Sequence, residues 1–513
     1  MFQARMVENR WFNLTVQQLF TQTCLDRPDK TAIIFGDMKI TFRDLLENVH
    51  RLSQALINLG VSRGDHVVML PTPCPEFICL YLATLQIGAV INPLNLLWGI
   101  LDFQGVLERN DPKVIVTVDR LGSRDFIKTI RDSIPDLGYK GENVSSDHIP
   151  TLKRLVSLSR EGEKHEGFLD FSEVMKFGGD YSEEDMIRRA GEGECTDIQF
   201  ICQTSGSTGL SKSVLWDHRP PLATAYFMGK NLGFTEEDSY LNLAPIYHNS
   251  GIVALNLNLV LAGTTLFLME QFNPQKAVEL IDKHKITTTF GFEAHWQAMK
   301  RVSHFDRYDF TIKKALIGGE PKTYDLVREM CRKENVIINT LYAQTENGPL
   351  VACNDYDCVL YGLKKYTNGR PLPGVELVIR DLENEEKLPP GKPGEICYRS
   401  PFLFKGYYKQ EEETKRLFDK DGYFHSGDFG TFDNGYVVFL GRLGGVVKCG
   451  GENVSTLRVT SLLMDRFAED FDDVNTVGVP DPYWGTKVVS WVRLKAGQVL
   501  RSTGELRNQC KGS

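Results

Sequence analysis

The stretch IQFICQTSGSTG, residues 198–209, joins an apolar run to a loop rich in glycine and hydroxyl side chains. The short apolar run predicts a buried strand over Ile198–Cys202. Beyond it, the segment from Thr204 to Lys212 offers backbone N–H groups exposed by glycines, hydroxyl donors and one ammonium. This combination suits a phosphate group. Because ligands bind beyond the carboxyl ends of strands in parallel α/β sheets, the junction predicts a phosphate site.

The loop departs from the Walker A pattern, G-x-x-x-x-G-K-[ST], at one position. Gly206 stands at the right distance before Lys212, but Ser211 replaces the second glycine. That glycine lets the backbone fold closely over the phosphates, so its loss argues against a Walker A loop. The candidate phosphate contacts of the loop are Thr204, Ser205, Gly206, Ser207, Thr208, Gly209 and Lys212.

Apolar runs of strand character alternate with helical stretches along much of the chain. Residues 66–72, 113–119 and 286–292 are runs of this kind. The alternation predicts an α/β fold whose parallel sheets are covered on both faces. The polar and charged composition of residues 136–195 predicts connections that lie at the surface. From about Pro371 short strands separated by turns predict a small β-rich subdomain.

Composition favours a globular protein and disfavours several other classes. The 59 Lys and Arg residues against 67 Asp and Glu give a net charge of -8, which argues against a nucleic-acid-binding surface. The 11 cysteines form no C-x-x-C pair, and the start carries no apolar export signal, so we expect a cytoplasmic protein. Residues 251–269 are apolar, but Asn256, Asn258 and a break at 263–265 predict a buried helix and strand, with no transmembrane segment.

Further motifs follow the loop in order: IGGEP (317–321), LYAQTE (341–346), GEICYRSPFLFKGYY (394–408), FHSGDFG (424–430) and GRLGGVVKCGGENVS (441–455). Together they resemble the adenylate-forming superfamily, and specifically its fatty-acyl-CoA synthetase branch, over nearly the whole chain. In that family the loop T-S-G-[ST]-T-G-x-x-K clamps the phosphates of ATP. The resemblance therefore implies ATP, Mg²⁺ and CoA as the cofactors.

The resemblance also implies a role for each matching residue. The catalytic candidates are Thr204, Lys212, Glu346 and His248. Outside the loop, the implied nucleotide and CoA contacts are Gly318, Gly319 and Glu320 on the adenine edge, Leu341, Tyr342 stacked on adenine, Thr345 on the α-phosphate, Glu346 on Mg²⁺, Asp428 and Arg442 on the ribose hydroxyls, and Lys448 on the CoA side. A single carboxylate with phosphate oxygens is the usual way that proteins hold Mg²⁺ on a nucleotide.

The implied acyl pocket contains His248, Asn249, Gly251, Phe292 and His295. No nucleophile lies near His248 in sequence, so we interpret it as a pocket wall or gate and not as a general base. An amino-acid-activating relative would carry an aspartate for the substrate's ammonium, but residues 246–252 and 290–296 contain none. We therefore predict a hydrophobic carboxylate, with a medium-chain fatty acid favoured.

Two domains are expected. The first, an AMP-binding domain over 1–441, has two parallel-rich α/β subdomains and the small β-rich subdomain. The second, over 442–513, is an α+β lid domain that turns about Gly444. We expect this lid to be incomplete, because the family continues to a lysine at the α-phosphate that has no counterpart here. Loss of a cation that acts on developing charge predicts impaired adenylation.

The predicted function is an ATP-dependent acyl-CoA synthetase, which joins a small-molecule carboxylate to CoA through an acyl-AMP intermediate. Two alternatives stay open. One is a catalytically impaired pseudoenzyme that binds a nucleotide or an acyl ligand. The other is an acyl-AMP ligase that loads a carrier protein. A homodimer is also left open, and a nucleic-acid partner is not expected.

Overall fold

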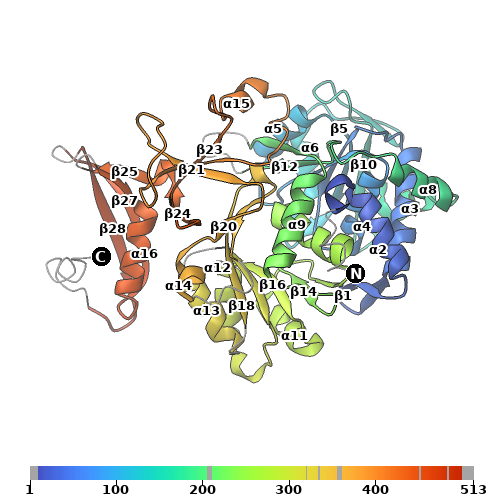
Figure 1. The fold of residues 1–513 in the computed structure, drawn as a ribbon. Helices are drawn as coiled ribbons and strands as arrows, with labels where there is room; N and C mark the ends of the chain where they lie inside the picture. The colour runs from blue at the N-terminus through green and yellow to red at the C-terminus, as the bar shows by residue number, and fades with distance from the viewer. Residues whose placement is uncertain are drawn as a thin grey trace.

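The computed structural model describes residues 10–204, 211–318, 321–332, 336–354, 361–449, 452–481 and 485–499. Two large mixed sheets form most of the molecule, followed by a four-stranded antiparallel sheet and a second four-stranded sheet (Figure 1). The expected α/β class, with a small β-rich part and a C-terminal α+β part, is therefore confirmed.

The first large sheet has nine strands, and its six central strands are parallel. Antiparallel strands close both edges. In spatial order the strands are β2 (Met38–Thr41), β1 (Thr31–Phe35), β15 (Thr265–Leu268), β14 (Ser239–Asn242), β16 (Thr288–Phe292), β17 (Lys314–Gly318), β18 (Ile337–Ala343), β19 (Leu350–Cys353) and β20 (Arg370–Pro371).

The second large sheet has seven strands, and only its last pair is antiparallel. In spatial order the strands are β11 (Leu169–Asp170), β10 (Arg154–Leu158), β5 (Pro112–Val118), β3 (His66–Leu70), β4 (Val90–Pro93), β12 (Phe200–Gln203) and β13 (Ser213–Trp216). The phosphate-type loop thus joins two antiparallel strands. A Walker A loop leads from a strand into a helix, so the structure agrees with the distinction made from Ser211.

Helices cover both large sheets, and several lie in the interior. They are α2 (Val16–Asp26), α3 (Phe42–Asn58), α4 (Pro75–Gln86), α5 (Ile100–Asn110), α6 (Phe126–Ser133), α7 (Phe171–Phe177), α8 (Glu183–Gly191), α9 (Arg219–Asn231), α10 (Asn249–Leu255), α11 (Pro274–His284), α12 (Glu293–Lys300), α13 (Pro321–Cys331) and α14 (Tyr361–Tyr366). All residues of α4 except Glu76 are buried, which explains its apolar side chains on every face.

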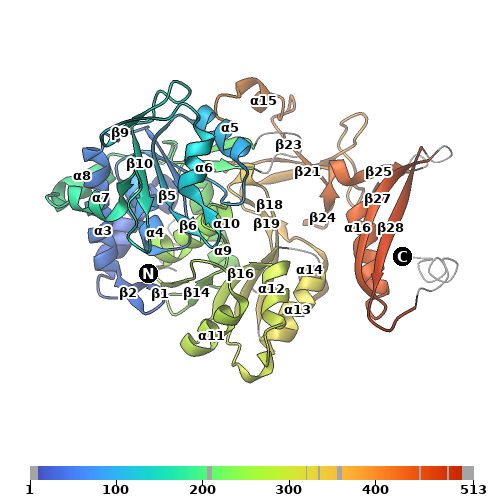
Figure 2. The same cartoon turned by 180° about the vertical axis from the view of Figure 1, so that it is seen from behind.

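The β-rich subdomain is an antiparallel sheet in the order β21 (Glu376–Arg380), β22 (Gly394–Arg399), β23 (Phe424–Asp433) and β24 (Tyr436–Arg442). The last sheet has the order β26 (Glu452–Ser455), β25 (Val446–Cys449), β28 (Gly485–Leu494) and β27 (Phe471–Asp481), with α16 (Thr456–Arg466) packed on it. Both views place this sheet at one end of the molecule, beyond the β-rich subdomain (Figures 1 and 2).

Two local predictions have different outcomes. The apolar segment 251–269 forms α10, the π-helix η2 (Asn256–Ala262), a turn at Gly263 with φ 61° and then β15, as expected for a buried helix and strand. No helix among the described residues is long and apolar enough to cross a membrane. The interpretation of 136–195 as surface connections was wrong in part, because β10 lies inside the seven-stranded sheet with Leu155 and Val156 buried.

Candidate functional site

A cavity of about 1520 Å³ lies between the large sheets, the β-rich subdomain and α16. Twelve of the predicted residues line it: Thr204, Lys212, His248, Asn249, Phe292, Gly318, Leu341, Tyr342, Thr345, Glu346, Asp428 and Arg442. Of the remaining candidates, Ser205–Gly209, Gly319 and Glu320 lie outside the described residues. The structure therefore brings together side chains that are more than two hundred positions apart in the sequence.

Three predicted residues do not line this cavity. Gly251 is buried in the first turn of α10, against the backbone of Pro245 and Ile246, where a side chain would not fit. His295 caps its own helix, because the N–H of Phe292 donates to its Nδ1 at 3.2 Å. Lys448 lies on β25, where its exposed ammonium pairs with Glu383. The roles assigned to these three residues stay predictions.

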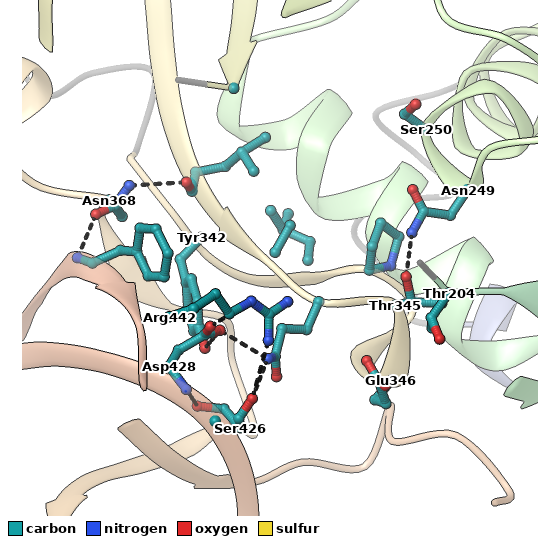
Figure 3. A pocket seen from close by; sticks show the side chains of 18 of the residues that line it. Thr204, Asn249, Ser250, Tyr342, Thr345, Glu346, Asn368, Ser426, Asp428 and Arg442 are labelled. Carbon is teal, nitrogen blue, oxygen red and sulfur yellow. Dashed lines mark hydrogen bonds and ion pairs between the residues drawn. The ribbon is translucent and has the colours of Figure 1, made fainter. Parts of the chain in front are cut away.

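At one end of the cavity, Asp428 is enclosed by donors (Figure 3). Its side chain is 2% exposed, and its Oδ2 accepts bonds from the Tyr342 hydroxyl at 2.7 Å and from Gln344 Nε2 at 2.8 Å. Arg442 Nε lies 3.0 Å from Oδ1. Tyr398 donates to Gln344 Oε1 at 2.7 Å, which fixes the orientation of the amide so that its nitrogen faces Asp428.

The electrostatic state of Asp428 follows from these surroundings. Burial raises the pKa of this carboxyl to about 6, and the nearby charge of Arg442 and the hydroxyl of Tyr342 act in the opposite direction. At pH 7 the group is therefore mostly ionised, but only because its partners offset much of the desolvation. A buried carboxylate with Arg442 beside it is a suitable acceptor for a vicinal diol.

Tyr342 also stacks on a second aromatic ring. Its ring and that of Phe439 lie 5.9 Å apart between centroids, with 22° between their planes. Asn368 supports this pair, because it donates to the carbonyl of Leu341 at 3.0 Å and accepts from the N–H of Phe439 at 2.8 Å. One face of the Tyr342 ring is thus covered by the protein itself.

Thr345 lies beside Thr204, between Asn249 and Glu346 (Figure 3). Asn249 Nδ2 donates to its hydroxyl oxygen at 3.0 Å, and Trp216 Nε1 donates to its carbonyl at 2.9 Å. The bond from Asn249 uses a lone pair of the hydroxyl oxygen, so the hydroxyl can still donate its own proton. Such a donor suits an anionic oxygen such as that of a phosphate.

The neighbouring Glu346 is held by the β-rich subdomain. The Tyr407 hydroxyl donates to Glu346 Oε1 at 2.8 Å, and the N–H of Phe404 donates to its carbonyl at 2.8 Å. Burial, and then the charge of Glu346, raise the pKa of the Tyr407 phenol, so this phenol remains a donor at neutral pH. A half-buried carboxylate fixed in this way fits a hard divalent cation, for which oxygen ligands are preferred.

Lys212 is held by an acid that the motifs did not identify. Its ammonium lies 2.6 Å from Glu413 Oε1 and 4.9 Å from the centre of the Tyr407 ring. The loop ends are joined, because the N–H of Thr204 donates to the carbonyl of Lys212 at 3.1 Å. The Lys212 ammonium therefore lies at the cavity. Among the described residues, Glu413 neutralises its charge.

The opposite end of the cavity is mainly apolar and aromatic. His248 and Phe292 meet edge to face with ring centroids 5.9 Å apart, and Phe290 lies 4.9 Å from Phe292. His248 is exposed to the cavity, and desolvation by the protein around it lowers its pKa to about 4, so the imidazole is neutral at pH 7. This agrees with a pocket wall or gate and gives no support for a general base.

Several lining residues were not predicted from the sequence. Gln344 and Tyr407 stand within quoted motifs without an assigned role, and Glu413 lies outside every motif. Near the apolar end the additional lining residues include Met228, Tyr240 and Val253. Only the motif residues carried a sequence signal, because contacts made across distant elements leave no local pattern.

The model of the AMP-binding enzyme family matches residues 20–408. The mitochondrial medium-chain acyl-CoA ligase ACSF2 of Rattus norvegicus is 27% identical over 512 residues, which cover 98% of this chain and 82% of that protein. Among solved structures, the ATP-bound RpMatB-BxBclM chimera B3 is 25% identical with a TM-score of 0.78, over 96% of this chain and 91% of that chain.

A second solved structure supports the fold alone. The anthranilate CoA ligase AuaEII in complex with anthranoyl-AMP has a TM-score of 0.81 at 20% identity, over 97% of this chain and 90% of that chain. These similarities include the C-terminal strands, and the incompleteness expected for the lid is not shown by them. The domain boundary at 441 and the cytoplasmic location also stay predictions.

Proposed function

This chain belongs to the AMP-binding enzyme family, and from that premise we propose that it is an ATP-dependent acid–thiol ligase of the acyl-CoA synthetase type. In the first step a carboxylate oxygen attacks the α-phosphorus of ATP, the bond to the bridging oxygen breaks, and pyrophosphate leaves. In the second step the thiol of CoA loses its proton, its sulfur attacks the acyl carbon, and AMP leaves. Catalysis consists mainly of positioning and charge neutralisation.

The observation that carries this proposal is the order of groups along one cavity. The Asp428–Arg442 pair would hold the ribose hydroxyls, and the Thr345 hydroxyl would donate to the α-phosphate. Lys212 and the loop that begins at Thr204 would bind the outer phosphates. Glu346 would hold Mg²⁺, which supplies charge neutralisation on the phosphate oxygens.

For the acyl group we infer a hydrophobic carboxylate, with a medium-chain fatty acid favoured. The described lining residues at the apolar end carry no charged group at pH 7, since His248 is neutral there. A second carboxylate or an ammonium on the substrate would lose hydration without gaining a partner. An aromatic acid is the second candidate, because Phe290 and Phe292 offer edge and face contacts to a ring.

The acceptor and the lid complete the proposal. Arg442, Gly444 and Arg458 line the cavity from the side of the C-terminal sheet, so this side would close over the nucleotide. We infer that rotation about Gly444 then admits the thiol beside Lys448, with CoA favoured as the acceptor. A carrier protein that bears the same pantetheine thiol is the alternative.

The test is pyrophosphate release with Mg²⁺, ATP, CoA and a panel of butanoate, octanoate, palmitate, benzoate and malonate. Octanoate is expected to give the highest kcat/KM, and Glu346→Gln to lower it by about 10²–10³-fold, as for other groups that act on transition-state charge. The exposed Glu386→Gln serves as the matched control and should leave it unchanged.

Three outcomes would redirect the proposal. Release that is highest with benzoate would favour the aromatic acid. Product formation with a holo-carrier protein but not with CoA would favour the carrier-loading alternative. If no acid releases pyrophosphate although ATP raises the Tm, the chain is a nucleotide-binding pseudoenzyme.

A further inference from the structure

Three potential metal ligands converge in the β-rich subdomain, and none of them has a part in the proposed reaction. Glu395 and Cys397 lie two residues apart on β22, and His425 lies opposite Cys397 on β23. Alternation along a strand places Glu395 and Cys397 on the same face. Between Glu395 and Cys397 the pairing register of the two strands shifts, so that Ser426–Asp428 of β23 stand opposite a single residue of β22.

The separations fit a tetrahedral cation of the zinc class. His425 Nδ1 lies 3.6 Å from Cys397 Sγ and 2.8 Å from Glu395 Oε2, and the three ligand atoms lie within 4.8 Å of one another. With Zn–S of about 2.3 Å and Zn–N of about 2.05 Å, a tetrahedral sulfur-to-nitrogen edge is about 3.6 Å. The nitrogen-to-oxygen edge would open to about 3.4 Å as metal bonds replace the hydrogen bond.

The charges and the access route also fit. A thiolate and a carboxylate balance the two charges of the cation, and Arg380, which acts on Cys397, is already paired with Asp419 and Asp421. Cys397 is fully buried, whereas the side chains of Glu395 and His425 are 14% and 20% exposed. His425 also lines the main cavity, which gives a cation a route from solvent.

We propose that Glu395, Cys397 and His425 form a binding site for a divalent cation of the zinc class, with a fourth position for water. Because a thiolate is the form that binds the metal, the Cys397 thiol releases its proton to solvent when the cation binds. Glu395 binds through Oε2 alone, because its Oε1 accepts from the N–H of Gly427 at 2.9 Å. The site is separate from Glu346, and the proposal does not depend on acyl-CoA synthetase activity.

A second cluster in the described part of the chain supplies an internal control. Asp119, Glu163 and His165 also bring their ligand atoms within 4.8 Å of one another, but this cluster contains no sulfur. A thiolate-to-metal absorption band can therefore distinguish the two clusters. His165→Asn is the matched control for His425→Asn, because both changes remove one imidazole from a three-residue cluster.

The experiment is titration of the metal-free full chain with Co²⁺, followed by competition of Zn²⁺ against a chromogenic chelator. The wild type is expected to bind one Co²⁺ with a thiolate charge-transfer band. Cys397→Ser should abolish the band, His425→Asn should weaken Zn²⁺ binding at least tenfold, and His165→Asn should change neither. Thermal unfolding of each variant confirms that it is folded.

Several results would overturn the proposal. These are a wild type without the band, a band that persists in Cys397→Ser, or Zn²⁺ binding that His165→Asn lowers as much as His425→Asn does. If Cys397→Ser does not fold, His425→Asn decides the question, because its side chain is partly exposed and its loss leaves the strand pairing intact.

Discussion

Asp428 and Lys212 are the two charged anchors of the cavity, and they are held in opposite ways. Asp428 is buried, and Tyr342, Gln344 and Arg442 surround it with groups that stabilise its ionised form. Lys212 is 31% exposed and pairs with an acid, Glu413, that would compete with a phosphate. The end that we propose for the ribose is therefore organised without a nucleotide, whereas Lys212, at the end that we propose for the phosphates, would have to exchange Glu413 for a phosphate.

The largest expected effect comes from removing the charge of Asp428. Asp428→Asn leaves Arg442 without its counter-charge and puts an amide N–H₂, a donor, in place of one of the oxygens that face Arg442, Tyr342 and Gln344. Hydrogen bonds to a charged group contribute about 1.5–3 kcal/mol each, and the ribose hydroxyls would lose such bonds, so KM for ATP should rise about 10²-fold. Asp433→Asn, an exposed change on the same strand, should leave KM for ATP unchanged. An equal effect of both changes would refute the assignment of Asp428 to the ribose hydroxyls.

The pH dependence of ATP binding tests whether the ionised form of Asp428 is required. The pKa of Asp428 is raised to about 6, so the carboxyl becomes protonated as the pH falls through that value. The neutral form cannot balance Arg442, and kcat/KM for ATP should fall about tenfold per pH unit below about 6. Asp428→Asn should lose this inflection, and a variant that keeps it would assign the pKa to another group.

Gln344 is expected to have an intermediate effect, because it is a neutral partner of a charged group. In Gln344→Leu the bond from Nε2 to Asp428 is lost, and hydrogen bonds to charged groups contribute about 1.5–3 kcal/mol. KM for ATP should rise about tenfold, and the inflection near pH 6 should move to higher pH. If Gln344→Leu raises KM for ATP but leaves the inflection near pH 6 unchanged, then Gln344 supports the fold and does not act on Asp428.

The smallest expected effect is a fall in KM for ATP instead of a rise. Glu413→Gln removes the competitor of the phosphates for Lys212, and an ion pair this exposed is worth about 0–1 kcal/mol. KM for ATP should therefore fall about two- to fivefold. Glu412→Gln, on the neighbouring exposed residue that pairs with Lys415, is the matched control. A rise in KM in Glu413→Gln would show that Glu413 positions Lys212 instead of competing for it.

The resemblance to the adenylate-forming superfamily predicted that Asp428, Arg442, Thr345 and Glu346 share a site, and all four line one cavity. Their partners could not be found in that way. Glu413 is 201 positions from Lys212, and nothing in its sequence neighbourhood, EEET, distinguishes it from a solvated helix start. Contacts of this kind depend on how the subdomains pack and not on local periodicity.

The fold was predicted well where apolar runs were clear and less well elsewhere. The strand before the phosphate loop was expected from Ile198 to Cys202 and is observed as β12 over Phe200–Gln203. By contrast, β10 has the sequence RLVSL within a polar region, and its strand character appears through pairing with β5 and β11. The polar surroundings concealed an interior strand.

The hairpin formed by β12 and β13 has a consequence for the order of folding. Its strands pair residues only 10–16 positions apart, from Gln203 with Ser213 to Phe200 with Trp216, so closing it costs little chain entropy. Tyr342 and Asp428, which meet at the other end of the cavity, are 86 positions apart. Because local contacts form fastest, we expect the Lys212 end to be structured early in refolding and the Asp428 end to appear late.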